Sequence, residues 1–213
     1  MILSKDLLFV HVPKTGGTSI RHFLLDNLPR PVLHVRQHDR NLPPSAADAT
    51  HLIGNKHMDL VAVRPLVQLF TGVDIRDLPA VIAGVRDPYA REVSLFRYWA
   101  RNQKQVVSAF GAFWPDFEAF TRRESTLDRR LGNFYMIDGV VPANLRFIRT
   151  ESMEADLRAA LASIGLATDA PVPALNVAPN PIDAGVITPR AEAAIHARYR
   201  LYFERGLYPR MSV

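Results

Sequence analysis

The chain contains no cysteine and no apolar run long enough to cross a membrane. Without cysteine, structural disulfides and thiolate-bound metal sites are excluded. A membrane-spanning helix needs about 20 consecutive apolar residues, and no segment approaches that length. The first residues, MILSKDLLFVHV, lack the basic stretch, long apolar core and cleavage site of a signal peptide. We therefore expect a cytoplasmic protein without a transmembrane segment.

Acidic residues are outnumbered by basic ones, which leaves a net charge of +5 and a pI near 9.8. Much of the excess is arginine, whose planar fork suits phosphate and sulfate groups. No basic run is interleaved with aromatic residues, so we expect no nucleic-acid partner. With 213 residues and 48% hydrophobic content, the chain can bury one sizeable core, and we expect a single domain over residues 1–213.

The hydrophobic pattern alternates between short apolar runs and amphipathic segments. It predicts strands near 7–12, 50–53, 80–85 and 145–149, and helices near 17–28, 88–101, 113–122, 151–164 and 189–204. Two proline-rich stretches, 28–49 and 170–185, predict loops, and Thr188 can cap the last helix, whose first position is Pro189. Strands that alternate with helices indicate an α/β fold, in which a central, mainly parallel sheet is flanked by helices.

The segment PKTGGTS, residues 13–19, follows an apolar strand and opens a helix. It is not a Walker A loop, because Lys14 precedes Gly16 and Gly17, whereas the Walker lysine follows its second glycine. The glycines allow backbone N–H groups to approach an anion, and Thr18 and Ser19 add hydroxyls at the positive end of the helix dipole. The motif predicts a phosphate-type site; the alternative is an ordinary turn between strand and helix.

A second segment of the same kind, PAVIAGVRDPYAREVSLFRYW, covers residues 79–99. Its strand ends at Arg86, Asp87 can cap the following helix, and Pro88 takes the first helical position. Ser94 lies on the same helix face as Asp87 and leans back towards Arg86, so the two side chains can share an anion. The alternative pairs Arg86 with Asp87 and bonds Ser94 to its own helix.

These two segments resemble the cofactor motifs of sulfotransferases that use 3′-phosphoadenosine 5′-phosphosulfate (PAPS). PKTGGTS resembles the 5′-phosphosulfate loop, and VRDPYAREVSLFRYW resembles the 3′-phosphate motif. The pair is most similar to the carbohydrate branch, which includes the heparan sulfate O-sulfotransferases and bacterial relatives. NKHMDL (55–60), RFIRTESMEADLRAALASIGL (146–166) and ALNVAPNP (174–181) are similar to later family segments, although Asp87 stands where asparagine is commoner.

The resemblance implies a P-loop-like three-layer fold and a sulfotransferase that uses PAPS as its sulfuryl donor, without a metal. It implies that Arg86 and Ser94 hold the 3′-phosphate and that Lys14 is catalytic, because it neutralises the oxygen that leaves sulfur. The acceptor would be a hydroxyl on a carbohydrate, glycoconjugate or glycolipid. The 5′-phosphosulfate would be held by six loop residues: Lys14, Thr15, Gly16, Gly17, Thr18 and Ser19.

The acceptor hydroxyl needs a base that is neutral near physiological pH, which favours histidine. His57, in NKHMDL, matches the family position and is the predicted catalytic base, with His51 as the alternative. His11, directly before the glycine loop, is predicted to be a packed residue at the end of a strand.

Two other functions fit parts of the sequence. A P-loop kinase-like phosphotransferase would also hold phosphates, but it predicts a lysine after the second glycine and an acidic metal ligand at the end of a neighbouring strand. Here Thr18 and Ser19 follow Gly17, and the neighbouring strand ends in Arg86. A non-catalytic domain that binds anionic glycans would explain the basic charge but not the two motifs.

Overall fold

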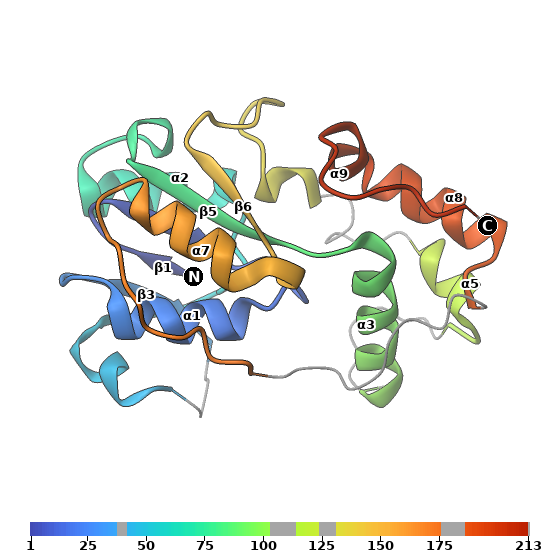
Figure 1. Ribbon diagram of the computed structural model, residues 1–213, viewed down its shortest axis with the longest axis horizontal. Coiled ribbons are helices and arrows are strands. Elements are labelled where there is room, and N and C mark those ends of the chain that lie inside the picture. Colours follow the sequence, from blue (N-terminus) through green and yellow to red (C-terminus); the bar gives the residue numbers. More distant parts are fainter. Residues whose placement is uncertain (38–41, 103–113, 124–130, 176–185, 213) are drawn as a thin grey trace. The chain divides into compact units, whose positions relative to one another are not determined.

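The computed structural model describes residues 1–37, 42–102, 114–123, 131–175 and 186–212, which are drawn as coloured ribbon in Figure 1. They form two compact units. The first contains Met1–Val85 and Gly132–Val177, and the second contains Arg86–Leu131 and Ala178–Val213. Whether residues 1–213 fold as one domain stays a prediction. In the described ranges, no helix combines the length and the apolar character needed to cross a membrane.

The first unit is an α/β fold built on a six-stranded sheet with the order β4-β3-β1-β2-β5-β6. β1 runs antiparallel to both of its neighbours, β2 and β3, while β2, β5 and β6 are parallel, as are β3 and β4. Five strands therefore point the same way, which confirms a mainly parallel sheet. The strands are β1 (Ile2–Leu3), β2 (Leu7–Val10), β3 (Leu33–Arg36), β4 (Thr50–Ile53), β5 (Ala80–Val85) and β6 (Leu145–Arg149).

Helices flank this sheet. In Figure 1, α7 (Met153–Ala162) lies in front of the strands and α2 (Leu60–Thr71) lies behind them. The main core cluster joins strand residues such as Phe9 and Ile82 to α1 (Gly17–Asn27) through Phe23 and to α7 through Leu157, all almost fully buried. Strands β2 and β5 contribute alternate residues to this core, Leu7 and Phe9 from β2 and Ala80 and Ile82 from β5, as the strand period of two requires. Among the described residues, four 3₁₀ turns connect the elements: η1 (Pro44–Asp48), η2 (Ile75–Asp77), η3 (Leu131–Phe134) and η4 (Thr150–Ser152).

Two predictions about these elements were wrong. The stretch 28–49, predicted to be a loop, contains β3 and η1, because a short strand between prolines still finds a parallel partner in β4. α2 had no predicted counterpart, because it carries Pro65 in its interior and apolar residues on both its buried and its exposed faces. The predicted helix 189–204 is present but is interrupted at Tyr199, and part of the predicted helix 113–122 lies outside the described residues.

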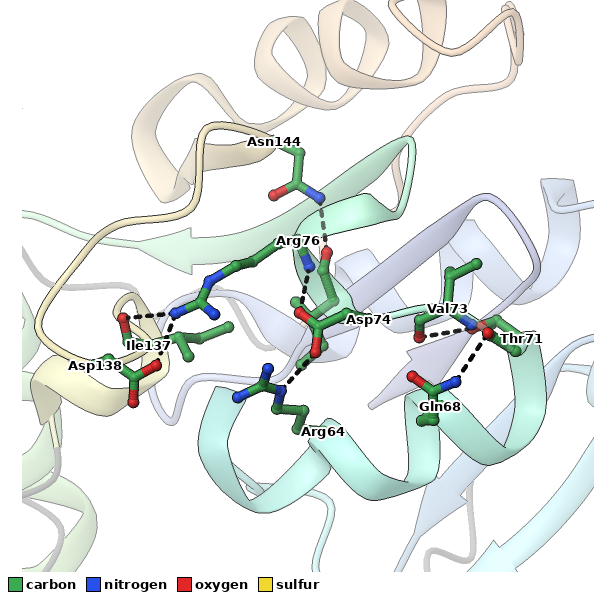
Figure 2. Close-up of polar contacts among 11 residues, drawn as sticks. Arg64, Gln68, Thr71, Val73, Asp74, Arg76, Ile137, Asp138 and Asn144 are labelled. Carbon is green, nitrogen blue, oxygen red and sulfur yellow. Dashed lines mark hydrogen bonds and ion pairs between the residues drawn. The ribbon is translucent and has the colours of Figure 1, made fainter.

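A polar network ties α2 to the turn before β5 (Figure 2). Arg64 donates to Asp74 at 2.6 Å, and the other oxygen of Asp74 accepts from the backbone N–H of Arg76 at 3.1 Å. The Arg76 side chain then pairs with Asp138 at 2.8 Å. Asn144 donates to backbone carbonyls of η2 and of the residue after it, both at 2.8 Å. Segments that are more than 60 residues apart in the sequence are thus held together by directional bonds.

In the part of the second unit that the structure describes there are four helices: α3 (Pro88–Arg101), α5 (Phe117–Thr121), α8 (Pro189–Arg198) and α9 (Arg200–Glu204). Two of them begin with the predicted caps. The Asp87 carboxylate accepts from the N–H of Ala90 at 2.8 Å, and the Thr188 hydroxyl accepts from the N–H of Ala191 at 3.2 Å. In each case proline follows at the first helical position, where its missing N–H costs nothing.

A fully buried carboxylate, Glu92 on α3, organises this unit. Arg123 donates to both of its oxygens, at 2.6 and 3.2 Å, and the Tyr199 hydroxyl donates to it at 2.6 Å. Arg198 approaches to 3.3 Å. Burial would raise the pKa of Glu92, but Arg123, with help from Arg198 and Arg91, holds that pKa below its ordinary value. The carboxylate therefore stays ionised and joins α3 to α8 and to the residues after α5.

The Asp74 network predicts a pH-dependent loss of stability in Asp74→Ala. The N–H of Arg76 and the guanidinium of Arg64 lower the pKa of Asp74. A carboxyl with a depressed pKa stabilises the fold above its unfolded pKa of about 3.9, and this contribution is lost as pH falls through the folded pKa. At pH 7 the substitution should cost about 1 kcal/mol, as the loss of a capping acceptor does, and the difference from wild type should shrink below about pH 4.

Chemical denaturation at several pH values measures this difference. Asp77→Ala, in the same 3₁₀ turn but at an exposed position, is the matched control and should change stability little at any pH. Equal losses in the two variants would contradict the role given to Asp74.

Candidate functional site

The topology of the first unit brings two predicted segments to one edge of the sheet. β2 and β4 point the same way, so their carboxyl ends lie at the same edge. The glycine loop follows β2, and the segment with His57 follows β4. In open α/β sheets, ligands bind at this edge, where loops and helix N-termini converge. The segment that continues β5 begins at Arg86 and belongs to the second unit.

The glycine loop has the backbone of an anion-binding turn. Lys14 and Gly16 both adopt left-handed conformations, with φ of 67° and 73°, so the chain turns sharply before α1 begins at Gly17. Ser19 N–H bonds back to the carbonyl of Gly16 at 3.0 Å, whereas the N–H groups of Gly17 and Thr18 have no acceptor within the helix. First-turn N–H groups and the positive end of the helix dipole favour a bound anion.

Close packing explains the small residues in and near the loop. The Thr15 side chain is fully buried and donates to the carbonyl of Val12 at 2.9 Å, so it can offer a ligand only its backbone. A Cβ at Gly84 on β5 would lie 2.4 Å from the Thr15 hydroxyl oxygen and 3.0 Å from its carbonyl oxygen. Only glycine at position 84 allows the loop to approach β5 this closely.

Ser19 is already hydrogen bonded in the structure. Its hydroxyl accepts from the N–H of Leu175 at 3.0 Å and lies 3.4 Å from the carbonyl oxygen of the same residue. The predicted loop 170–185 therefore reaches the first turn of α1, with Thr168 bonded to Asn27 at the other end of that helix. This is where the asparagine-bearing segment ALNVAPNP begins; its residues from 176 onward lie outside the described ranges.

His57 lies beside the glycine loop, although it follows β4, which is an edge strand of the sheet and is not adjacent to β2. β4 is separated from β2 by β3 and β1, about 14 Å at the usual strand spacing. The segment after β4 covers this distance, and Nδ1 of His57 lies 2.7 Å from the carbonyl oxygen of His11. A carbonyl only accepts, so Nδ1 carries the hydrogen and the lone pair of the neutral ring lies on Nε2. That nitrogen can take a proton.

His11 is buried at 6% exposure and lies in a cationic environment. Burial lowers its pKa well below the ordinary value, and the amino terminus, His57, Lys56 and Arg21 act in the same direction. The prediction that His11 is a packed residue at the end of a strand is confirmed, because its ring stacks on Phe9 with centroids 5.6 Å apart. Since all these charged neighbours are positive, the surroundings of the loop favour an anion.

The alternative base, His51, makes its contacts away from the glycine loop. It lies on β4, packs edge-on against the buried His34 with centroids 5.4 Å apart, and its Nε2 is 2.8 Å from the carbonyl oxygen of Ala46. That contact puts the hydrogen on Nε2, so the free lone pair of His51 is on Nδ1. Of the two predicted histidines, His57 is the one that contacts the residue leading into the glycine loop.

The second motif lies in the second unit. Asp87 caps α3 through its contact with Ala90, and within the described residues neither Arg86 nor Ser94 makes a hydrogen bond or ion pair. The two bonds of the structural alternative, Arg86 to Asp87 and Ser94 to its own helix, are therefore not formed. Both side chains are partly accessible, so they can still bind an anion.

Two basic residues near the loop were not among the predicted ligands. Arg21 follows Gly17 by one helical turn on α1, is 4% exposed, and contributes to the positive potential at His11, as does Lys56 beside His57. The one-turn spacing from Gly17 was the available signal for Arg21. Lys56 lies near the loop because the segment following β4 contacts His11 through His57.

No group of three or more His, Asp or Glu side chains within the described ranges is arranged to hold a metal ion. Comparison of the chain with protein-family models, curated proteins and solved structures finds no match.

The geometry predicts opposite tautomers for the two candidate histidines. In ¹⁵N spectra of the neutral imidazoles, His57 should show a protonated Nδ1 and an unprotonated Nε2, whereas His51 should show the reverse. The variants His57→Gln and His51→Gln assign the two sets of signals, and each histidine serves as the control for the other. A protonated Nε2 in neutral His57 would contradict its contact with His11.

Proposed function

We propose that this chain is a PAPS-dependent sulfotransferase that moves a sulfuryl group to an acceptor hydroxyl. The observation that carries the proposal is the contact of His57 Nδ1 with the carbonyl of His11, at 2.7 Å, because it presents a basic nitrogen beside an anion-binding loop. A base next to an anion site is what transfer from a bound anion to a hydroxyl requires. The resemblance of both motifs to the PAPS motifs supports PAPS as the bound anion.

In the proposed reaction, the acceptor oxygen attacks sulfur in line with the bond to the leaving phosphate. Its proton passes to Nε2 of His57, a new S–O bond forms, and the bond between sulfur and the bridging oxygen breaks. Adenosine 3′,5′-bisphosphate leaves with the bonding electrons. Sulfuryl transfer resembles phosphoryl transfer, so positioning and charge stabilisation supply most of the catalysis.

The loop residues take separate roles in this scheme. Lys14 neutralises the charge that develops on the bridging oxygen, and the N–H groups of Gly17 and Thr18 bind the 5′-phosphosulfate. Arg86 and Ser94, which make no hydrogen bonds among the described residues, are proposed to bind the 3′-phosphate. Ser19 can join the ligand only by exchanging its present bonds to Leu175.

The rival functions explain less of the site. A domain that only binds anionic glycans does not require a histidine whose lone pair is held in a fixed position beside the loop. A kinase-like phosphotransferase fits the anion loop, but Lys14 lies on the wrong side of the glycines and Arg86 replaces the expected acidic metal ligand. A carbohydrate or glycolipid hydroxyl as acceptor, a P-loop-like three-layer architecture and a cytoplasmic location complete the proposal.

Cofactor choice can be tested by ligand-induced stabilisation. Adenosine 3′,5′-bisphosphate at a hundredfold excess over its dissociation constant should stabilise the fold by about 2.7 kcal/mol. AMP and ATP–Mg²⁺ should stabilise it much less at the same concentration, because neither offers a 3′-phosphate. Thermal unfolding with each nucleotide measures this, and equal stabilisation by AMP would remove the second motif from the binding site.

Arg86→Ala should reduce the affinity for adenosine 3′,5′-bisphosphate by about 10²-fold, as the loss of a charge-assisted hydrogen bond to phosphate does. Its affinity for AMP should not change. Arg101→Ala, an exposed arginine in the last turn of the helix that follows Arg86, is the matched control and should bind both nucleotides normally. Isothermal titration of the three proteins makes the comparison, and unchanged affinity in Arg86→Ala would place the 3′-phosphate elsewhere.

Substitutions of Lys14 and His57 should have different effects on turnover and on donor affinity. Lys14→Met should lower turnover more than donor affinity, because its interaction grows with charge on the leaving oxygen. His57→Ala should bind adenosine 3′,5′-bisphosphate normally and lose about 10²–10⁴-fold in turnover, together with the acidic limb of the pH profile. His51→Ala is the control; if it, and not His57→Ala, loses that limb, His57 is not the base.

A further inference from the structure

One residue of the first unit contacts both the anion loop and the candidate base, through different groups. It is His11, the first residue beyond the strand pairs of β2 with β5, which end at Val10 and Ala83. Val12 N–H bonds to the carbonyl of Val10 at 3.1 Å, which forms a γ-turn centred on His11. This turn removes His11 from the ladder. Its carbonyl is then available to His57 Nδ1.

The side chain of His11 contacts the start of α1. A Cβ built on Gly17 would lie 2.2 Å from Cδ2 and 2.3 Å from Nε2 of the His11 ring, so the ring lies directly against the glycine backbone. The ring cannot easily move away, because Phe9 stacks on it and the His57 ring meets it edge-on with centroids 4.7 Å apart. Gly17 is therefore required by a neighbouring side chain, since its own φ is one that other residues adopt.

The ring also carries a polar atom without a partner. Nδ1 of His11 is buried and makes no hydrogen bond within the described residues. A buried polar atom without a partner costs stability, so the contacts that this ring makes must offset that cost. The shape of the five-membered ring, wedged between Gly17 and His57, is what this position uses.

We propose that His11 is a positioning residue that couples the anion loop to the base. Its ring sets the distance between the end of β2 and the first turn of α1, and its carbonyl fixes the His57 tautomer that leaves Nε2 able to accept a proton. The naming of His57 as the base rests on the proposed function. The coupling itself concerns only contacts among His11, Gly17 and His57.

A double-mutant cycle tests the coupling without any ligand. Gly17→Ala should lower the unfolding midpoint in wild type, because its Cβ meets the His11 ring. In the background of His11→Ala the space is open, so adding Gly17→Ala should lower the midpoint no further, as expected for residues in contact. The control cycle uses His22→Ala, on α1 five residues beyond Gly17, where the two effects should add.

The ¹⁵N signals of His57 give the second measurement. His11→Ala keeps the backbone carbonyl but removes the ring that packs against Gly17, Phe9 and His57 and so holds this carbonyl in place. The single Nδ1–H tautomer should therefore become a mixture, whereas His22→Ala should leave it unchanged. His11→Asn, which keeps part of the ring volume, serves the same two measurements if His11→Ala does not fold. Additive effects of the His11 and Gly17 substitutions, or an unaltered His57 tautomer, would overturn the proposal. Failure to bind adenosine 3′,5′-bisphosphate would instead count against the proposed function, since neither measurement here uses a nucleotide.

Discussion

The hydrogen bond from His57 Nδ1 to the carbonyl of His11 is the interaction on which the candidate site depends. It joins residues 46 positions apart that follow strands separated by two others. The γ-turn at the end of β2 makes the carbonyl available, and the Asn55 side chain, which accepts from the N–H of His57 at 2.9 Å, shapes the segment that arrives. Without this bond, the glycine loop would remain, but the candidate base would not be held beside it.

In the first unit, small residues and a buried polar bond allow the glycine loop to pack closely against the sheet. The absence of a side chain at Gly84 allows Thr15 to pack against β5, and its absence at Gly17 allows the ring of His11 to pack against the start of α1. Both contacts leave no room for a methyl group. The loop conformation is therefore imposed by its neighbours as much as by its own sequence, which is how a turn with Lys14 in a left-handed conformation is held in place.

The second unit is organised differently, around charge. Glu92 is fully buried and is bonded by Arg123 and Tyr199, with Arg198 close by. A buried carboxylate without partners would be strongly destabilising, so these helices must assemble together with their arginines in place. Helix α3, which follows Arg86 and contains Ser94, is thereby fixed through Glu92 in its second turn. The predicted caps at Asp87 and Thr188 define where α3 and α8 begin.

The sequence alone was sufficient to predict those elements whose structure depends on residues close together in the chain. The apolar runs of β2 and β5, the caps at Asp87 and Thr188 and the glycine loop before α1 were all predicted, because strand burial, capping and tight turns depend on residues a few positions apart. The short strand β3 and the helix α2 were missed. β3 is defined by pairing with β4, and α2 is apolar on both its buried and exposed faces, so neither has a clear periodic signal.

The residue types of the candidate site were also readable in the sequence, since lysine, glycines, hydroxyls and arginine in this order favour an anion. What only the tertiary structure decided is which residues meet. It placed His57, and not His51, against the loop, directed the Thr15 hydroxyl inward, and bonded Ser19 to Leu175. These outcomes depend on strand order and on packing between segments distant in the chain, and no local pattern encodes such distances.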